Sequence, residues 1–108
     1  MTEFIQIYTT TENKDDARMI AQRVVGKRLA ACAQVVGPIF STFWWEGAIE
    51  EAEEWLCIMK SKKFLFDKLE EAILGVHPYD VPEIVAVPIV TGSQKYLQWL
   101  NKEVHLDL

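Results

Sequence analysis

This sequence has no long hydrophobic run and no leader-like start. Its longest stretch that is apolar throughout, proline included, is Ile84–Val90, far shorter than the roughly 18 residues of a membrane-spanning helix. The segment Met1–Phe4 lacks the basic and apolar regions of a signal peptide. Both absences predict a cytoplasmic protein without a membrane span.

The sequence also has fewer basic than acidic residues. The chain has 11 Lys and Arg against 16 Asp and Glu, which gives a net charge of −5. Nucleic-acid binding gains much of its affinity from neutralised phosphates, which an acidic chain does not provide. An RNA-recognition module would also need a third strand rich in glycine and aromatics, whereas Glu53–Met59 is acidic and aliphatic. We therefore expect no nucleic-acid partner.

Cysteine is scarce, and the motifs of common enzyme classes are missing. Cys32 and Cys57 are too few for a disulfide framework, which fits a reducing compartment. The 5 glycines are isolated, so no phosphate-binding loop is present, and neither G-x-S-x-G nor H-E-x-x-H occurs. These absences predict a protein that is not an enzyme, while an enzyme with His77 as its general base stays open as an alternative.

The first part of the chain predicts a strand and an amphipathic helix. Phe4–Tyr8 alternates β-forming residues and is followed by threonines, which predicts a strand that ends near Tyr8. Asn13 and Asp16 have the spacing of a helix cap pair. Apolar residues then recur at helical spacing as far as Gly26, where the helix is expected to end.

Two long strands are predicted next. Ala30–Phe43 is rich in β-formers but contains Gly37-Pro38, which predicts a bulge or bend because proline cannot donate to a ladder. Trp44-Trp45 closes this strand. Glu46-Gly47 provides a tight turn into the second strand, Ile49–Lys60.

The position of this turn also sets the distance between the two thiols. It pairs Cys32 with about Ser61 and Cys57 with about Val36, which places the thiols roughly 13 Å apart along the ladder. A disulfide needs Cα atoms within about 7 Å, so we expect none within one chain. We interpret both cysteines as small buried hydrophobes, with a soft metal ligand or a redox thiol as the alternative.

The rest of the chain predicts a helix, a loop, a strand and a last helix. Ser61 is expected to cap the helix, and His77–Glu83 follows as a loop because proline disfavours helix in the residue before it. Ile84–Val90 is apolar, as in a strand covered on both faces, but its proline places it at a sheet edge. Ser93 is expected to cap the last helix. The inner side of that helix carries Tyr96, Leu97 and Leu100.

Together these elements follow the order strand, helix, strand, strand, helix, strand, helix. This order is the split βαβ plan of a ferredoxin-like α+β sandwich, with an antiparallel sheet, a long hairpin and a C-terminal helix. The length, and the lack of a linker or repeat, predict a single domain over residues 1–108.

The sharpest chemical signal is the loop His77–Glu83, where prolines stiffen a segment that carries an imidazole and carboxylates. His77 has the chemistry to bind copper, zinc or nickel through a neutral ring nitrogen. Asp80 and Glu83 would ligate the metal or orient the ring. The alternative is a structural turn, since the loop lacks the closed set of Cys and His that structural zinc needs.

The hairpin is crowded with aromatic and acidic residues. The aromatic residues suggest packing against another subunit, with an aromatic-lined ligand pocket as the alternative. The carboxylates suggest a solvated face, or else a surface that concentrates cations. The aromatic residues are Phe40, Phe43, Trp44, Trp45 and Trp55, and the acidic residues are Glu46, Glu50, Glu51, Glu53 and Glu54.

Several segments, in order along nearly the whole chain, resemble the CutA divalent-ion tolerance proteins. They are Arg28–Ala33 (RLAACA), Trp44–Gly47 (WWEG), Glu53–Trp55 (EEW), Lys60, His77–Ile84 (HPYDVPEI) and Tyr96–Leu100 (YLQWL). The resemblance implies a ferredoxin-like subunit in a homotrimer, with long hairpins that extend onto neighbouring subunits, similar in architecture to PII signalling proteins. It also implies a role in tolerance of divalent metals, copper above all.

The same resemblance implies metal binding at the histidine of the H-P-Y motif, here His77. Where some members carry a cysteine and a second histidine, this chain has Tyr8 and Val76, which are poor ligands or none. His77 is then the expected ligand, with Cys32 as a more distant candidate. Copper or another divalent cation is the expected cofactor, and no organic cofactor is expected.

A PII-like sensor or scaffold is the alternative function. In this hypothesis, clefts between subunits, walled by Trp45, Lys60 and Tyr79, hold a small anionic ligand. The argument rests on similarity of architecture. Three-fold symmetry would also gather three copies of one residue into a site that a single chain does not contain.

Overall fold

The computed structural model describes residues 3–105, which form a four-stranded antiparallel sheet with helices against it. The elements in order are β1 (Phe4–Thr11), α1 (Lys14–Gly26), β2 (Cys32–Trp45), β3 (Ala48–Lys62), a 3₁₀ turn (Lys63–Leu65), α2 (Phe66–Leu74), β4 (Val85–Pro88) and α3 (Gln94–Glu103). The sheet order is β2-β3-β1-β4, and each neighbouring pair is antiparallel. This α+β arrangement confirms the predicted split βαβ plan.

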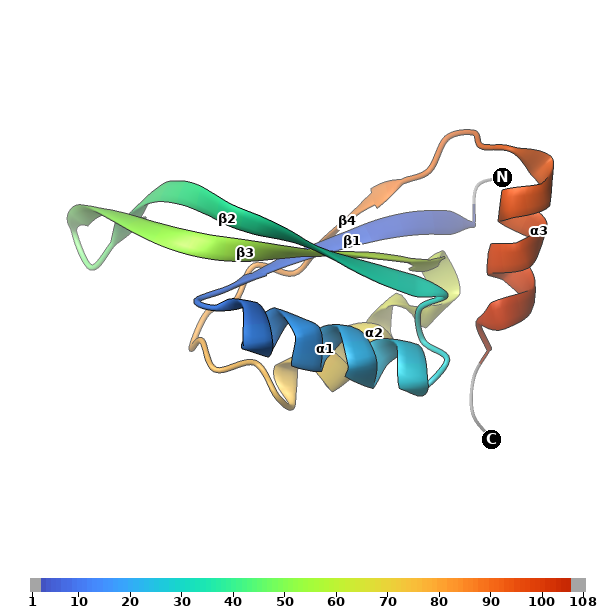
Figure 1. The fold of residues 1–108 in the computed structure, drawn as a ribbon, viewed down its shortest axis with the longest axis horizontal. Helices are drawn as coiled ribbons and strands as arrows, with labels where there is room; N and C mark the ends of the chain where they lie inside the picture. The colour runs from blue at the N-terminus through green and yellow to red at the C-terminus, as the bar shows by residue number, and fades with distance from the viewer. Residues whose placement is uncertain (1–2, 106–108) are drawn as a thin grey trace.

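The hydrophobic core lies between the sheet and one layer of helices. Figure 1 shows α1 and α2 beneath one face of the sheet, α3 beside one end of it, and the β2-β3 hairpin extending beyond the helices at the other end. Ile7 of β1 and Met59 of β3 are fully buried with Ile20 of α1 and Leu69 of α2. Each such side chain stabilises the fold by about 1.5–3 kcal/mol. We call the sheet face turned away from α1 and α2 the open face.

β1 is longer than the sequence predicts. It does not end near Tyr8 but continues to Thr11, because Thr9–Thr11 pair with Trp55–Cys57 of β3. Threonine is β-branched and fits a strand well, so it was wrong to expect the strand to end at the threonines.

Two predicted helix caps are confirmed. The Asn13 side chain accepts a hydrogen bond from the Asp16 backbone N–H at 2.8 Å, at the start of α1. The Ser93 hydroxyl oxygen accepts from the Tyr96 N–H at 3.2 Å, at the start of α3. Each bond satisfies a backbone donor that the first turn of a helix leaves unpaired.

The third predicted cap, Ser61, is wrong. Ser61 lies inside β3, is fully buried, and its hydroxyl donates to the Leu29 carbonyl. The chain then makes the 3₁₀ turn, and α2 begins only at Phe66. A buried serine in a strand and a serine at a helix start look the same in sequence, since both precede an apolar helical pattern.

The β2-β3 hairpin contains the predicted bulge. Pairing is regular from the turn at Glu46-Gly47, which has positive φ values of 51° and 83°, as far as Ile39. It then shifts, so that Gly37-Pro38 stands opposite the single residue Trp55. A Cβ at Gly37 would lie 2.5 Å from the Trp55 ring, so glycine allows the indole to pack directly on the backbone of β2.

The bulge moves both cysteines by one residue from their predicted register. Cys32 faces Lys60, and Cys57 faces Val35. The thiols therefore stand about 10 Å apart along the ladder rather than 13 Å, because the extra residue of β2 was not counted. Both cysteines are free, as predicted, with Cys57 buried and Cys32 half-buried.

The C-terminal part of the chain contains the predicted edge strand, but the faces of this strand are less covered than the sequence predicts. β4 lies at the sheet edge beside β1, but only Val85–Pro88 is strand, and all of it is exposed in the single chain. The prediction of a strand covered on both faces is therefore wrong for one chain. On the inner side of α3, Leu100 is fully buried and Leu97 half-buried, while Tyr96 remains exposed. No helix in residues 3–105 is long and apolar enough to cross a membrane.

Two arginines tie the ends of α2 and α3 to α1. Arg23 Nε donates to the Ala72 carbonyl of α2 at 3.1 Å. Just beyond α1, Arg28 Nη1 donates to the Glu103 carbonyl at 3.2 Å and to the Glu103 carboxylate at 2.6 Å, at the end of α3. Arg28 has a φ of 64°, the left-handed conformation that glycine usually adopts after a helix.

Candidate functional site

His77 lies after α2 at the start of the loop to β4, and both of its ring nitrogens are hydrogen-bonded. The Tyr79 backbone N–H donates to Nδ1 at 3.1 Å, so Nδ1 carries no proton. Nε2 therefore carries the proton and donates to the Thr10 carbonyl of β1 at 2.9 Å. A ring bonded in this way is neutral and is fixed against the end of β1.

The surroundings of His77 hold its pKa below the ordinary value. Partial burial is the largest cause, and it outweighs three effects that raise the pKa: the bond to Thr10 and the negative charges of Asp16 and Glu54. The neutral ring is the form that binds metals. A metal ion at either nitrogen must nevertheless displace a hydrogen bond that the ring already makes.

Tyr79 fixes the same loop to β3. Its ring packs against His77 with centroids 4.9 Å apart, and its hydroxyl donates to Glu54 Oε2 at 2.7 Å. Burial, the hydrogen bond to Glu54 and the nearby negative charges raise the pKa of Tyr79 well above its usual range, so the phenol stays a donor. We call His77, Tyr79, Thr10 and Glu54 the loop anchor. It holds the loop against the end of β1 and the middle of β3.

The two loop carboxylates stay on the surface. Asp80 and Glu83 are exposed, and within the described residues no hydrogen bond or ion pair joins either of them to His77. Across residues 3–105, no group of three or more His, Cys, Asp or Glu side chains is close enough to hold a metal ion. One chain therefore does not assemble a multidentate metal centre around the predicted ligand.

Cys32 lies apart from His77. Cys32 stands opposite Lys60 on β3, whereas Thr10, which accepts from His77, stands opposite Leu56. The two positions are about 13 Å apart along β3. These two predicted ligands therefore do not meet within one chain.

The two thiols have different surroundings. Cys32 Sγ lies 3.5 Å from the Tyr96 hydroxyl of α3. Burial, and then the bond to Cys32, raise the pKa of Tyr96 to about 12. Burial raises the pKa of Cys57 to about 11, which keeps that thiol protonated and a poor nucleophile or ligand.

The three predicted cleft residues do not meet in one chain either. Lys60 donates to the Gln34 side chain at 2.7 Å, near the base of the hairpin. Tyr79 reaches Glu54, about 20 Å further along β3. Trp45 closes the far tip of β2. A cleft that contains all three must be built from more than one chain.

The hydrogen-bond partners of His77 and Tyr79, which are Thr10 and Glu54, were not predicted from the sequence. Thr10 contributes a backbone carbonyl, which no side-chain pattern identifies. Glu54 was counted only among the hairpin carboxylates, although it continues the row of alternate positions set by Leu56. Glu54 lies between Ala52 and Leu56 in that row, but Glu50 and Lys60 also belong to it, so the pattern alone does not mark Glu54 as buried.

The fold and the site define a small α+β protein with a protruding hairpin and a loop anchored by hydrogen bonds to two strands. A family model described as the CutA1 divalent ion tolerance protein matches residues 5–103. The chain belongs to this family, which confirms the resemblance found in the sequence. The family is one of divalent-cation tolerance proteins rather than enzymes, as predicted.

Relatives from plants and bacteria cover nearly all of the chain. A chloroplastic CutA 1 of Oryza sativa is 42% identical over 97 residues, which are 90% of this chain and 55% of the relative. The CutA of Thermus thermophilus is 41% identical over 96 residues, which are 89% of this chain and 93% of the relative. The chain thus spans about half the length of the rice relative and nearly all of the bacterial one.

Solved structures share the fold closely. The crystal structure of CutA1 from Oryza sativa superposes with a TM-score of 0.93 at 38% identity, covering 96% of this chain and 95% of that one. The Thermus thermophilus protein gives a TM-score of 0.92 at 38% identity, covering 94% and 99%. The rice relative is named chloroplastic and an Archaeoglobus fulgidus structure is titled periplasmic, so compartments differ among relatives.

Proposed function

We propose that this chain acts in the tolerance of divalent cations as a cytoplasmic homotrimer that contacts copper, or another divalent cation, through His77. The family assignment supports the tolerance role. The observation that carries the metal contact is the anchored loop, where a half-buried neutral imidazole lies within a few residues of the exposed carboxylates of Asp80 and Glu83. Those carboxylates would ligate the cation or hold its water.

The hydrogen bonds of His77 decide which nitrogen a cation uses and how tightly. At Nε2 the cation must remove both the proton and the bond to Thr10. At Nδ1 it displaces only the N–H of Tyr79, which leaves the tautomer unchanged. Losing one neutral hydrogen bond costs about 0.5–1.5 kcal/mol, or roughly two- to tenfold in affinity. We therefore expect weak contact through Nδ1.

The homotrimer is supported by apolar surface that one chain leaves uncovered. The open face carries valine and aromatic side chains that are about two-fifths exposed, and the other side of the hairpin tip is more exposed still. On the open face these are Val36, Phe43, Trp45, Val85 and Val87, and on the tip they are Phe40, Trp44 and Ile49. Exposed apolar side chains in this number favour contact with another chain.

The distribution of charge favours head-to-tail contact. The hairpin segment 39–54 carries five glutamates and no Lys or Arg, whereas the opposite end of the 44 Å long chain is mostly basic. The basic residues there are Lys60, Lys62, Lys63, Lys95 and Lys102. Opposite charges at the two ends attract the head of one copy to the tail of the next, and such contacts close into rings when the rotation allows.

The PII-like sensor or scaffold is a second candidate. It is supported by the separation of Trp45, Lys60 and Tyr79, since only neighbouring subunits could bring such residues together around a small anion. Lys60 supplies the positive charge that such a ligand requires. This candidate uses the same homotrimer but does not need a metal at His77.

A competitive titration separates the two candidates. Cu(II), and Cu(I) under reductant, are titrated against a chelator of known affinity into the wild-type protein, His77→Gln and, as control, His105→Ala. Metal affinity that falls in His77→Gln and persists in His105→Ala supports direct contact. Equal affinity in all three proteins would contradict it and direct attention to the clefts. Sedimentation velocity of the wild type checks the trimer separately.

A further inference from the structure

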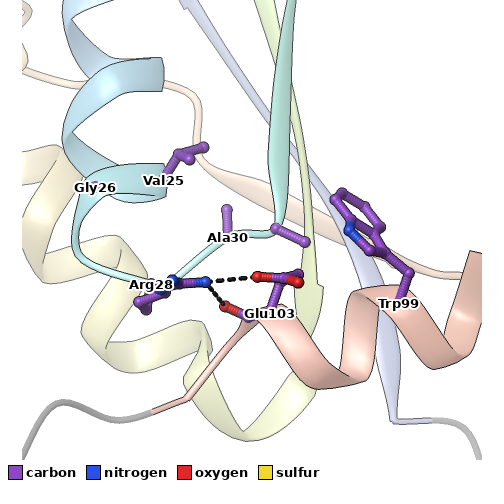
Figure 2. A pocket seen from close by; sticks show the side chains of 7 residues that line it. Val25, Gly26, Arg28, Ala30, Trp99 and Glu103 are labelled. Carbon is purple, nitrogen blue, oxygen red and sulfur yellow. Dashed lines mark hydrogen bonds and ion pairs between the residues drawn. The ribbon is translucent and has the colours of Figure 1, made fainter.

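A cavity of about 500 Å³ lies where the end of α1, the start of β2 and the helix α3 meet. Figure 2 shows the Arg28 guanidinium meeting Glu103 on one side and the Trp99 indole standing on the other. Val25 and Ala30 add apolar surface to the lining. The cavity therefore has a charged side and an apolar side, within the size range of small-molecule sites.

Much of the hydrogen-bonding capacity on the charged side is unused. Arg28 has five N–H donors, and only Nη1 bonds to Glu103, at 2.6 Å to Oε1 and 3.2 Å to the carbonyl oxygen. Within residues 3–105, Nε and Nη2 of Arg28 and Oε2 of Glu103 make no hydrogen bond. The two side chains are 52% and 31% exposed, so a ligand can reach them.

The backbone of Arg28 points to a role for its side chain. Its φ of 64° is a conformation that glycine adopts without strain and that other residues adopt at a cost. If the only requirement at position 28 were the backbone turn after α1, glycine would meet it at a lower conformational cost than arginine. The tie to α3 accounts for one nitrogen of the guanidinium and leaves the others without a function.

We propose that this cavity binds a free amino acid with an apolar or aromatic side chain. The α-carboxylate accepts from the Nε and Nη2 edge of Arg28, and the α-ammonium donates to Oε2 of Glu103. The side chain of the ligand packs on the Trp99 indole and the apolar wall. This inference concerns a site separate from the loop anchor and does not depend on the proposed metal contact.

The charges of the cavity explain why a zwitterion fits better than a simple ion. A lone anion would meet the Glu103 carboxylate beside the arginine, and a lone cation would meet the Arg28 guanidinium beside the carboxylate. The carboxyl ends of α1 and α3 also carry partial negative charge, which favours an ammonium group there. Only a ligand that carries an ammonium and a carboxylate group on the same carbon matches both halves of the Arg28–Glu103 pair.

The ligand series tests the charge requirement on the unmodified protein. Indole N–H signals of the 4 tryptophans are followed by NMR, with Trp99 assigned through Trp99→Phe. L-Phenylalanine should shift the Trp99 signal saturably. N-acetyl-L-phenylalanine and L-phenylalaninamide each lack one charge and should bind at least about tenfold more weakly, as expected when a charge-assisted hydrogen bond is lost. Absence of a saturable shift, or equal affinity for all three, overturns the proposal.

The protein variants test the residues. Arg28→Gln and Glu103→Gln should each weaken L-phenylalanine binding by about tenfold or more. Lys102→Gln, on the exposed side of the same helix, is the matched control and should leave it unchanged. Unshifted signals of the other tryptophans confirm that each variant is folded. Affinity lost equally in Lys102→Gln, or retained in both Arg28→Gln and Glu103→Gln, overturns the assignment.

Discussion

Thr9 carries a fully buried hydroxyl that has no hydrogen-bond partner within the described residues. Thr11, two positions along the same face of β1, is also fully buried, but its hydroxyl donates to the Asn13 carbonyl at 2.7 Å. Valine keeps the branched shape of threonine and replaces the hydroxyl by a methyl group. The pair Thr9→Val and Thr11→Val therefore makes the same chemical change with and without the loss of a hydrogen bond.

The two substitutions should change the free energy of unfolding in opposite directions. Burying a hydroxyl without a hydrogen bond costs about 1–3 kcal/mol, so Thr9→Val should stabilise the protein by up to that amount. Thr11→Val loses a made hydrogen bond and should destabilise it by about 0.5–1.5 kcal/mol. For a domain of this size, each kcal/mol corresponds to roughly 4–8 °C in Tm.

Guanidinium unfolding followed by circular dichroism measures both changes. All proteins are compared at one concentration, because assembly makes apparent stability depend on concentration. An unchanged slope with denaturant shows that the midpoint reports stability alone. A Thr9→Val protein that unfolds at lower denaturant than the wild type, or that shifts in the same direction as Thr11→Val, would refute the reasoning.

Three further predictions follow from the hairpin, the bulge and the loop anchor. Trp45→Ala should weaken the proposed homotrimer in sedimentation velocity, since it removes apolar surface from the open face; an intact trimer of equal heat stability would speak against this. Gly37→Ala should lower the unfolding midpoint, because its Cβ would lie 2.5 Å from the Trp55 ring, whereas Gly26→Ala, with nothing within 4 Å, should not. Because folding lowers the pKa of His77, its contribution to stability should be complete above pH about 6.5 and decline as pH falls; this slope should vanish in His77→Gln, and a slope unchanged by that substitution would contradict the assignment.

The parts of the fold that were predictable have determinants a few residues apart. Asn13 and Ser93 cap their helices through a backbone N–H three residues ahead, and Gly37-Pro38 marks the bulge by its own backbone chemistry. Ser61 was misassigned because its partner, Leu29, is distant in sequence and is reached only once the sheet has formed. The register of the cysteines differs from the prediction by one residue for another reason: the bulge was predicted, but its extra residue was left out of the pairing.

The candidate site was predictable only in part, for the same physical reason. The loop was found because its prolines, histidine and carboxylates are adjacent in sequence. Its anchoring was not found, since the bonds of His77 to Thr10 and of Tyr79 to Glu54 depend on how distant strands are placed. Donor types alone indicated a metal ligand, whereas the structure shows that both nitrogens of that ligand already hold the loop in place.

The extra residue at Gly37-Pro38 reverses the alternation of β2. Val36 pairs with Leu56, and Phe43 beyond the bulge pairs with Glu50, so an even-numbered and an odd-numbered residue of β2 share one face of the sheet. Before the bulge the even-numbered residues of β2 lie on the open face, and after the bulge the odd-numbered residues do. Without the bulge, regular alternation from Val36 would place Trp44 rather than Trp45 on the open face, although the composition of the hairpin tip would be the same. The bulge therefore decides, as much as residue identity does, which aromatic groups the hairpin carries on the open face.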